Sequence, residues 1–390
     1  MNRSDLIIAL KEEIGNPDLF VGRKKELDFF LDWAFKTKKE LSQSTAILSR
    51  RKKGKTALVQ RLFNLLYTLN DPQIIPFYFK IEEGNLPMLT FAELFYRTLL
   101  SQYFGFKLRE LGLFRKVLSY NELYQLVKDD EIIRKDIQVM EEYIANKNPD
   151  LAWNHARNAG HRISGQKDER IIQIIDEFQF LNAFIYTDNT YKTRIELASF
   201  YQGTAESKVS PQIITGSYIG WLTTIIRKMV SRYREFFLEG FPEEEALDAV
   251  YNHSTLLKQP VTDETASLIA NVCDHDPYYI AQVMMSNYEH KDLTDAGSVL
   301  ETLKHETTLP GGQIAKMWME YIWEAFEKVN DRNAKAIVLY LAKYGNEERT
   351  VEQIIRDLHL DMSPAELEEK LYKLERADII TMGPSFSIKK

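Results

Sequence analysis

Residues 49–56, Ser-Arg-Arg-Lys-Lys-Gly-Lys-Thr, are of the types that bind the phosphates of a nucleotide. They match the phosphate-loop motif G-x-x-x-x-G-K-[ST] at every defining position except the first, where Ser49 replaces glycine. Gly54 allows close approach of the backbone, and the N–H groups that open the next helix point at the phosphates. Lys55 is expected to reach the outer phosphates, and the Thr56 hydroxyl is expected to bind Mg²⁺. The remaining residues expected to line the loop are Arg51, Lys52, Lys53 and Ala57.

Two other interpretations of this stretch stay open at the level of the motif. Five of the six residues 50–55 are Lys or Arg, which is also typical of a basic patch that contacts nucleic acid. The second alternative is a basic strand-to-helix turn without a ligand. A Gly-Lys-Thr sequence between a predicted strand and a predicted helix favours the phosphate loop over both.

Two adjacent carboxylates, Asp176 and Glu177, follow the apolar run "IIQII". This is the Walker B pattern, in which Asp176 would hold Mg²⁺ and Glu177 would orient and polarise an attacking water. Neighbouring residues along a strand point to opposite sides, so the two carboxylates can have different roles. Acidic residues often end strands, so the pair alone is weak evidence for a Walker B motif. The presence of a predicted phosphate loop in the same chain strengthens this interpretation.

A third group of polar residues ends the apolar run "PQIITGS" (211–217). Ser217 is expected beside the phosphates, where it would sense the outer phosphate or help to place the water. Thr215 is the alternative sensor, and a plain turn after a strand is a third interpretation. Arginines farther along could reach phosphates in this chain or in a neighbour, although ordinary surface solvation is the alternative for each. They are Arg227, Arg232 and Arg234.

Short apolar runs predict the strands that position these residues. They cover 44–48, 74–81, 170–178 and 211–217, with 234–241 as a further candidate. Each run is almost continuously apolar, which is typical of a parallel sheet covered on both faces. Helical patterns such as 55–69 and 89–106 alternate with the runs, so we expect a doubly wound α/β domain.

The order of patterns predicts an N-terminal segment (1–19) and three domains. A P-loop domain covers 20–241 with a helical insertion around 107–168, whose polar end, 146–169, is expected to be partly loop. Strand signals nearly vanish in 242–330, which predicts an all-helical lid. Residues 331–390 predict three helices and then a hairpin around a Gly-Pro turn, the pattern of a winged helix.

Composition excludes some classes of protein. The 390 residues carry a net charge of −7, which argues against a protein that coats nucleic acid by charge alone. The single cysteine, Cys273, excludes a disulfide framework, and His155 and His161 lack a third ligand for zinc. No apolar run approaches the ~20 residues that a bilayer requires, so a cytoplasmic protein without a membrane anchor is expected.

Four of these stretches together resemble the archaeal-type ATPases of the STAND branch of AAA+ proteins. They are "FVGRKKEL" (20–27), "SRRKKGKT" (49–56), "IIDEFQFL" (174–181) and "ITGS" (214–217). The resemblance implies an AAA+-like P-loop domain, a helical lid and a winged helix over residues 20–390. It assigns Val21, Gly22 and Arg23 to the adenine side of the site, and it assigns Pro277, in "DHDPYYI" (274–280), to the turn by which the lid approaches the nucleotide.

The family's own loop is rich in arginine, so the basic residues need no nucleic acid to explain them. The chain departs from the family pattern at three points. Ser49 replaces the first glycine of the loop, Asp276 replaces the glycine before Pro277, and "SRYRE" stands where the family has "YGR".

The function expected from the resemblance is a nucleotide-dependent molecular switch that binds ATP or ADP with Mg²⁺ and hydrolyses ATP slowly. A protein partner contacted through the winged helix, or self-assembly, would follow. The alternative is a DNA-dependent AAA+ ATPase whose winged helix enters a groove. The candidate recognition helix, 363–376, has four acidic and three basic residues and an acidic N-terminal half, which disfavours DNA. A small-molecule P-loop kinase would leave the winged helix unexplained.

Overall fold

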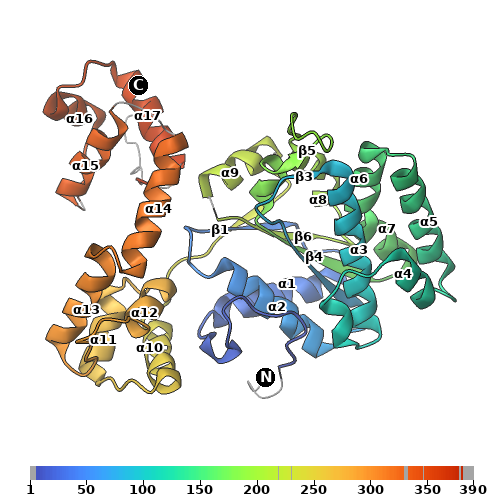
Figure 1. Ribbon diagram of the computed structural model, residues 1–390, viewed down its shortest axis with the longest axis horizontal. Coiled ribbons are helices and arrows are strands. Elements are labelled where there is room, and N and C mark those ends of the chain that lie inside the picture. Colours follow the sequence, from blue (N-terminus) through green and yellow to red (C-terminus); the bar gives the residue numbers. More distant parts are fainter. Residues whose placement is uncertain are drawn as a thin grey trace. The chain divides into compact units, whose positions relative to one another are not determined.

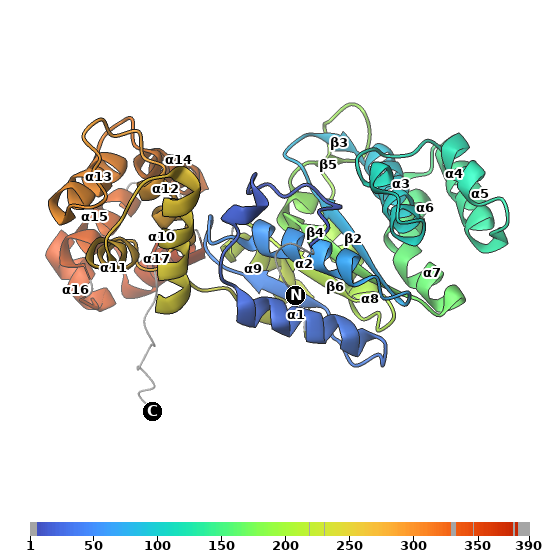
Figure 2. The ribbon, with the colours of Figure 1, turned by 90° about the horizontal axis from the view of Figure 1, so that it is seen from below.

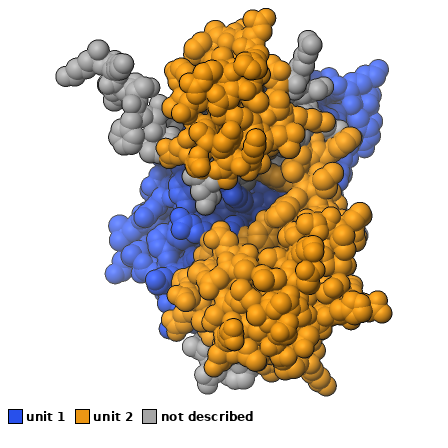
Figure 3. All heavy atoms as spheres, turned by 90° about the vertical axis from the view of Figure 1, so that its left-hand side faces the viewer, with its two compact units in different colours: residues 1–217, 224–239 blue, residues 218–223, 240–390 orange. Residues whose placement is uncertain are grey.

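The computed structural model describes residues 6–217, 219–229, 231–328, 333–345, 347–376 and 379–380. The chain divides into two compact units, coloured separately in Figure 3: unit 1 has residues 1–217 and 224–239, and unit 2 has residues 218–223 and 240–390. None of the helices in the described ranges combines the length and the apolar character that crossing a membrane requires.

Unit 1 is built on a five-stranded parallel sheet with the strand order β2-β4-β6-β1-β7. The strands are β2 (Ile74–Lys80), β4 (Arg170–Asp176), β6 (Gln212–Thr215), β1 (Thr45–Leu48) and β7 (Arg234–Phe237). All five strands expected from the apolar runs are present, and their parallel pairing confirms the predicted α/β fold. The central strands are buried along their whole length, which explains why they lack an alternating pattern.

Helices cover both faces of this sheet. In Figures 1 and 2, α1 (Lys24–Thr37) and α2 (Lys55–Leu69) lie on one face, and α3 (Met88–Lys107) lies on the other. A small parallel pair, β3 (Leu86–Pro87) and β5 (Ile185–Tyr186), was not expected from the sequence because two-residue strands leave no periodic signal. Shorter elements complete the unit: η2 (Pro17–Leu19), η3 (Leu111–Phe114), η4 (Phe178–Asn182), η5 (Leu197–Tyr201) and α8 (Gln202–Ala205). Helix α9 (Ile219–Lys228) is divided between the two units.

The helical insertion consists of four helices that gather beside α3 (Figure 1). They are α4 (Tyr120–Leu126), α5 (Glu131–Ala145), α6 (Pro149–Arg157) and α7 (Ala159–Lys167). Helices α6 and α7 fill most of 146–169, so the loop expected there is limited to 146–148, 158 and 168–169. Asn148 caps α6, and the buried Trp153 anchors it by packing its ring against Phe91 and Phe95 of α3. Polar composition hid this helix because its buried residues are few.

Unit 2 is helical over its described residues. Its first part has α10 (Glu243–Leu257), α11 (Asp263–Val272), α12 (Pro277–Met284), α13 (Ala296–Thr308) and α14 (Gln313–Lys328). Thr262 caps α11 through a reciprocal pair with Thr265, as expected for a Thr directly before a helix.

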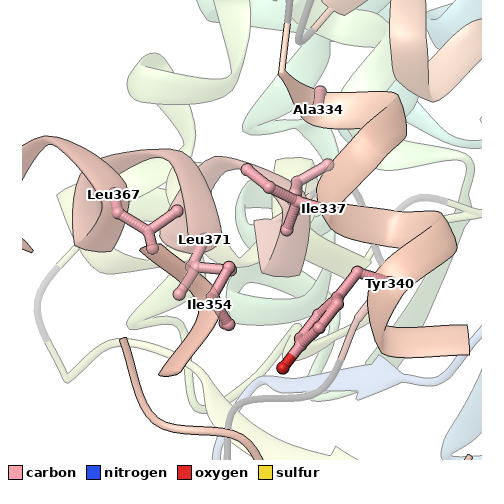
Figure 4. Close-up of a cluster of buried hydrophobic side chains, with 7 residues drawn as sticks. Ala334, Ile337, Tyr340, Ile354, Leu367 and Leu371 are labelled. Atoms are coloured by element: carbon pink, nitrogen blue, oxygen red, sulfur yellow. The ribbon is translucent and has the colours of Figure 1, made fainter. Parts of the chain in front are cut away.

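Three further helices of unit 2 share a small apolar core (Figure 4). They are α15 (Ala334–Tyr344), α16 (Val351–Leu358) and α17 (Pro364–Arg376). Ile337, Ile354 and Leu367 are completely or almost completely buried in this core, one from each helix. The hairpin expected after α17 falls on 379–390, of which 381–390 lie outside the described residues, so the winged helix stays a proposal.

Candidate functional site

The loop between β1 and α2 is the predicted phosphate loop. It contains two residues in the left-handed region, Lys52 at φ 70° and Gly54 at φ 88°. Gly54 is the N-cap of α2, and a Cβ built on it would meet nothing within 4 Å. The positive φ, and not crowding, is therefore what calls for glycine at this position. The first N–H groups of α2 follow directly, and such groups attract anions.

The Lys55 side chain lies along the inside of this loop and is 6% exposed. Its Nζ donates to the Ser49 carbonyl at 2.8 Å, to the Ser49 hydroxyl at 3.0 Å and to the Arg50 carbonyl at 2.9 Å. An ammonium has three protons, and each of these acceptors can take one. The serine that departs from the motif therefore contacts the lysine of the motif through its hydroxyl.

The Asp176 carboxylate, at the end of β4, is 1% exposed. The Thr56 side chain, from the first turn of α2, lies close enough to lower the pKa of this carboxyl. The Thr215 hydroxyl donates to Oδ1, and the Tyr78 hydroxyl donates to Oδ2 at 3.0 Å. The two residues predicted to hold a metal, Thr56 and Asp176, thus lie side by side. Two further residues, from β6 and β2, orient the carboxylate.

Burial sets the protonation of this cluster. Burial raises the pKa of Asp176, and the negative charge of Glu177 raises it further. The side chains of Thr215, Thr56 and Tyr78 lower the pKa, but the net shift is upward. Burial, followed by the charge of Asp176, raises the pKa of Tyr78 well above its usual value. Tyr78 is therefore a protonated phenol near neutral pH, and it can only donate to the carboxylate.

Glu177 leaves the strand in the left-handed conformation, with φ 57°. This turn, and not the alternation of side chains along a strand, separates its carboxylate from that of Asp176. The Ser217 backbone N–H donates to Glu177 Oε2 at 2.9 Å, and the Ser217 hydroxyl donates to Oε1. The Gln179 amide donates to Oε2 at 2.6 Å. The two candidate sensors therefore have different partners, since Thr215 bonds to Asp176 and Ser217 bonds to Glu177.

The "VGR" stretch lies against the outside of the phosphate loop. Val21 is buried, Gly22 has φ 68°, and Arg23 is the left-handed N-cap of α1. Arg23 is 3% exposed and donates from Nη2 to the Lys53 carbonyl at 2.9 Å. Its Nη1 pairs with Glu26 at 3.0 Å. The structure thus joins Arg23 to the loop backbone, a contact that the expected adenine-side role did not include.

The remaining predicted residues lie at several places. Lys52 is exposed, Arg51 and Lys53 are half-buried, and Ala57 is in the first turn of α2. Pro277 opens α12 in unit 2, and Asp276 is its N-cap, accepting from the N–H groups of Tyr278 and Tyr279. At the position where the family pattern has glycine, this chain therefore has an aspartate that caps α12.

The three candidate arginines have ordinary surroundings in the structure. Arg232 pairs with Glu206 at 3.1 Å, and the Arg234 guanidinium lies over the Phe29 ring at 5.5 Å. Arg227 is exposed on the last turn of α9. Among the described residues, no group of three or more His, Cys, Asp or Glu could hold a metal.

Sequence reasoning missed Tyr78 and the polar residues of α2 behind it. Tyr78 lies within the apolar run of β2, where a tyrosine is indistinguishable from any other aromatic core residue. A signal was present in α2, where polar residues recur every fourth position among largely apolar neighbours. These residues are Gln60 and Asn64, which are buried, and Thr68, which is half-buried.

Comparison with known proteins adds the fold. No protein-family model matches the sequence, and no curated protein matches it. The chain is similar to a solved structure of a Walker-type ATPase of Pyrococcus abyssi, with a TM-score of 0.59 and 14% identity, over 94% of this chain and 92% of that chain. The chain has the fold of a Walker-type ATPase. It is also similar to the ORC2 protein of Aeropyrum pernix, solved in ADPNP-ADP complexes, with a TM-score of 0.50 and 13% identity, over 93% of this chain and 88% of that chain. In open parallel sheets, ligands bind at the carboxyl ends of the strands, where Ser49, Asp176 and Ser217 follow or end β1, β4 and β6.

Proposed function

We propose that unit 1 binds ATP with Mg²⁺ at the carboxyl edge of its sheet and hydrolyses ATP slowly, and that the chain works as a nucleotide-dependent switch of the STAND type. The observation that carries this proposal is the arrangement of the buried Lys55 ammonium inside the loop and of Thr56 near enough to the buried Asp176 carboxyl to lower its pKa. It brings together three groups, from two distant segments, that phosphate and Mg²⁺ binding require.

Different residues would contact different parts of the nucleotide. Backbone N–H groups after Gly54 and the Lys55 ammonium would bind phosphate oxygens. Val21, Gly22 and Arg23 would lie on the adenine side, and Arg23 would also hold the loop through the Lys53 carbonyl.

The site also fits Mg²⁺. A threonine hydroxyl and a carboxylate are oxygen ligands of the kind that Mg²⁺ takes together with substrate phosphates. When bound, the ion would neutralise charge on the outer phosphates. Three hydrogen bonds at the Asp176 carboxylate, from Thr215, Tyr78 and the Glu177 N–H, hold it in place.

Hydrolysis would depend on Glu177, which would orient and polarise the attacking water. Its carboxylate is held by Ser217 and Gln179, so its direction is set by two elements, the end of β6 and η4. Ser217 lies two residues before α9 in the sequence, and a change at the outer phosphate that moved Ser217 would be passed to this helix. A nucleotide can shift the equilibrium between two conformations of the chain only to the extent that it binds one of them more tightly than the other.

The switch also requires an output. We propose that Pro277 and the rest of the lid respond to the nucleotide, and that α15–α17 form the core of a winged helix that contacts a protein partner or a second copy. The first half of α17 is acidic, which supports a protein partner and disfavours DNA.

The first test is Lys55→Ala, with binding of ADP and of a non-hydrolysable ATP analogue measured by calorimetry with and without Mg²⁺. Loss of the lysine should weaken binding strongly, because a desolvated phosphate would lose its charged donor. Lys107→Ala is the matched control, since Lys107 pairs with Glu169 in another part of unit 1. Equal binding by Lys55→Ala and the unaltered chain would show that the site is wrong.

The second test addresses the switch. The mass of the assembly in solution is measured by light scattering with ADP and with the non-hydrolysable analogue. A change of mass or of hydrodynamic radius with the analogue supports a switch. Identical mass and radius with the two nucleotides, together with tight binding of both, would refute the switch and leave nucleotide binding alone.

A further inference from the structure

The N-terminal segment, residues 6–19, is bound along α2 by a regular set of hydrogen bonds. Side chains at every fourth position of α2 lie on one face of the helix. Each accepts from a backbone N–H of the segment, which therefore runs antiparallel to the helix. The three pairs are Glu13 N to Gln60 Oε1 at 2.8 Å, Leu10 N to Asn64 Oδ1 at 2.9 Å, and Ile7 N to Thr68 Oγ1 at 2.9 Å.

A buried ion pair fixes the middle of the same segment. Arg61 Nε and Nη2 donate to the two carboxylate oxygens of Glu12 at 2.7 and 2.8 Å, and the Glu12 side chain is completely buried. Arg61 also donates to the Pro17 carbonyl at 2.7 Å, and Asn64 donates to Glu12 at 3.0 Å. A buried charge that loses its partner is strongly disfavoured, so the segment is bound as part of unit 1.

A chain of side chains connects this segment to Asp176. The Gln60 Nε2 donates to the Tyr78 hydroxyl at 3.1 Å and lies 3.4 Å from Glu13 Oε1. The Tyr78 hydroxyl donates to Asp176 Oδ2 at 3.0 Å. A phenol has one proton, so its donation to Asp176 leaves it to accept from Gln60, and the direction of the chain is fixed. Gln60 and Tyr78 are 2% and 7% exposed, which keeps water from replacing them.

Lys80 adds a second link at the segment. Its Nζ pairs with Glu13 Oε1 at 2.8 Å, and in the β2–β4 register Lys80 is opposite Asp176. The other carboxylate oxygen of Asp176, Oδ1, already accepts from Thr215 and from the Glu177 N–H. The hydrogen bond that the structure records at Oδ2 comes from Tyr78.

We propose that Tyr78 is a positioning residue for Asp176, and that residues 6–19 hold Tyr78 in place through Gln60. This inference rests on the proposed function, in which Asp176 supports Mg²⁺ beside the nucleotide. The N-terminal segment is then a structural part of the metal side of the site, although none of its residues contacts Asp176.

The test is Tyr78→Phe, which removes the donor and keeps the ring. ADP affinity is measured by calorimetry at a series of Mg²⁺ concentrations and without Mg²⁺, so that the readout is the factor by which Mg²⁺ tightens binding. Groups that orient a metal ligand are typically worth about 10–100-fold in metal affinity, so we expect Tyr78→Phe to raise the Mg²⁺ concentration at half-effect about 10-fold or more. ADP affinity without Mg²⁺ should be unchanged.

Tyr103→Phe is the matched control. Tyr103 is also a buried tyrosine, and its hydroxyl donates to a carboxylate, Glu169 Oε2, at 2.8 Å. A general loss of stability from removing a buried phenol would affect both variants, whereas only Tyr78→Phe should change the Mg²⁺ factor. An equal Mg²⁺ factor in both variants overturns the positioning role.

Gln60→Met tests the link to the N-terminal segment. It should raise the half-effect Mg²⁺ concentration in the same direction by a smaller factor. In the double variant with Tyr78→Phe, the combined effect should be smaller than the product of the two, because both act through one hydrogen-bond chain. Independent, multiplicative effects overturn the link. If Tyr78→Phe does not fold, Gln60→Met alone decides, and an unchanged Mg²⁺ factor refutes the proposal.

The outcomes separate this inference from the proposed function. If the unaltered chain fails to bind ADP, or if Lys55→Ala binds it equally well, the proposed site is wrong. If the unaltered chain binds ADP with a clear Mg²⁺ factor that Tyr78→Phe leaves unchanged, only the positioning role is wrong.

Discussion

Ser49 offers a direct test of how the phosphate loop is set before nucleotide binds. Its hydroxyl accepts from Lys55 at 3.0 Å, and two backbone carbonyls accept from the same ammonium at 2.8 and 2.9 Å. A phosphate oxygen needs one of these three protons. The serine hydroxyl is the only one of the three acceptors that a substitution can remove without altering the backbone, and Ser49→Ala removes it.

The magnitude follows from the cost of releasing that acceptor. A single hydrogen bond contributes about 1 kcal/mol net, with somewhat more when the donor is charged. If nucleotide must displace the hydroxyl, Ser49→Ala should tighten binding by about fivefold. Ser49→Gly would add backbone freedom to the same change, so alanine isolates the hydroxyl.

The assay is competition of ADP against a fluorescent nucleotide at fixed Mg²⁺. Ser42→Ala is the control, because Ser42 is 3% exposed and its hydroxyl donates to the Trp33 carbonyl, away from the loop. In a Lys55→Ala background, Ser49→Ala should have no effect on affinity. An unchanged affinity in the normal background would show that the hydroxyl does not compete. A weaker affinity would show that it still supports Lys55 when nucleotide is bound, and either result refutes the reasoning.

Other variants test the proposed hydrolytic carboxylate, a half-buried ion pair of the helical insertion, and the bundle α15–α17. Glu177→Gln should keep nucleotide affinity and lower ATP turnover by roughly 10²–10⁴-fold, as measured by phosphate release, because it loses the base that acts on water; unchanged turnover removes Glu177 from the mechanism. In the helical insertion, burial by itself would raise the pKa of Asp136, but hydrogen bonds from His155 and Arg162 lower this pKa from 3.8 to about 2. The ionised Asp136 therefore stabilises the fold fully above its unfolded pKa, and this stabilisation is lost as the pH falls through about 2. Asp136→Asn should lower the free energy of unfolding, measured with urea at neutral pH, by on the order of 2 kcal/mol. It should also flatten the dependence of that free energy on acid pH. An equal slope in both proteins between about pH 4 and pH 2 contradicts this assignment. Duplex DNA should not bind at physiological salt, as followed by fluorescence anisotropy; salt-sensitive binding that is lost on removal of 331–390 would reverse the ranking of partners.

Much of the fold follows from local patterns in the sequence. The five apolar runs predicted the five strands because a strand covered on both faces must be apolar throughout. The limits of α2 were predicted at both ends, since Gly54 marks its beginning and the helical pattern ends with Leu69. Two-residue strands and the polar helix α6 left no such pattern, and the structure alone revealed them.

The chemistry of the site divides in the same way. The sequence by itself predicted the loop residues Gly54, Lys55 and Thr56 and the pair Asp176 and Glu177, because a short motif fixes the type and spacing of residues within one turn or one strand end. Only the tertiary structure decided what those residues contact. The β2–β4 and β4–β6 pairings bring Tyr78 and Thr215 to the two oxygens of Asp176, and the packing of residues 6–19 on α2 extends that contact to the N-terminal segment. Strand order and register are set by the burial of whole faces against one another, and no local stretch of sequence contains that information.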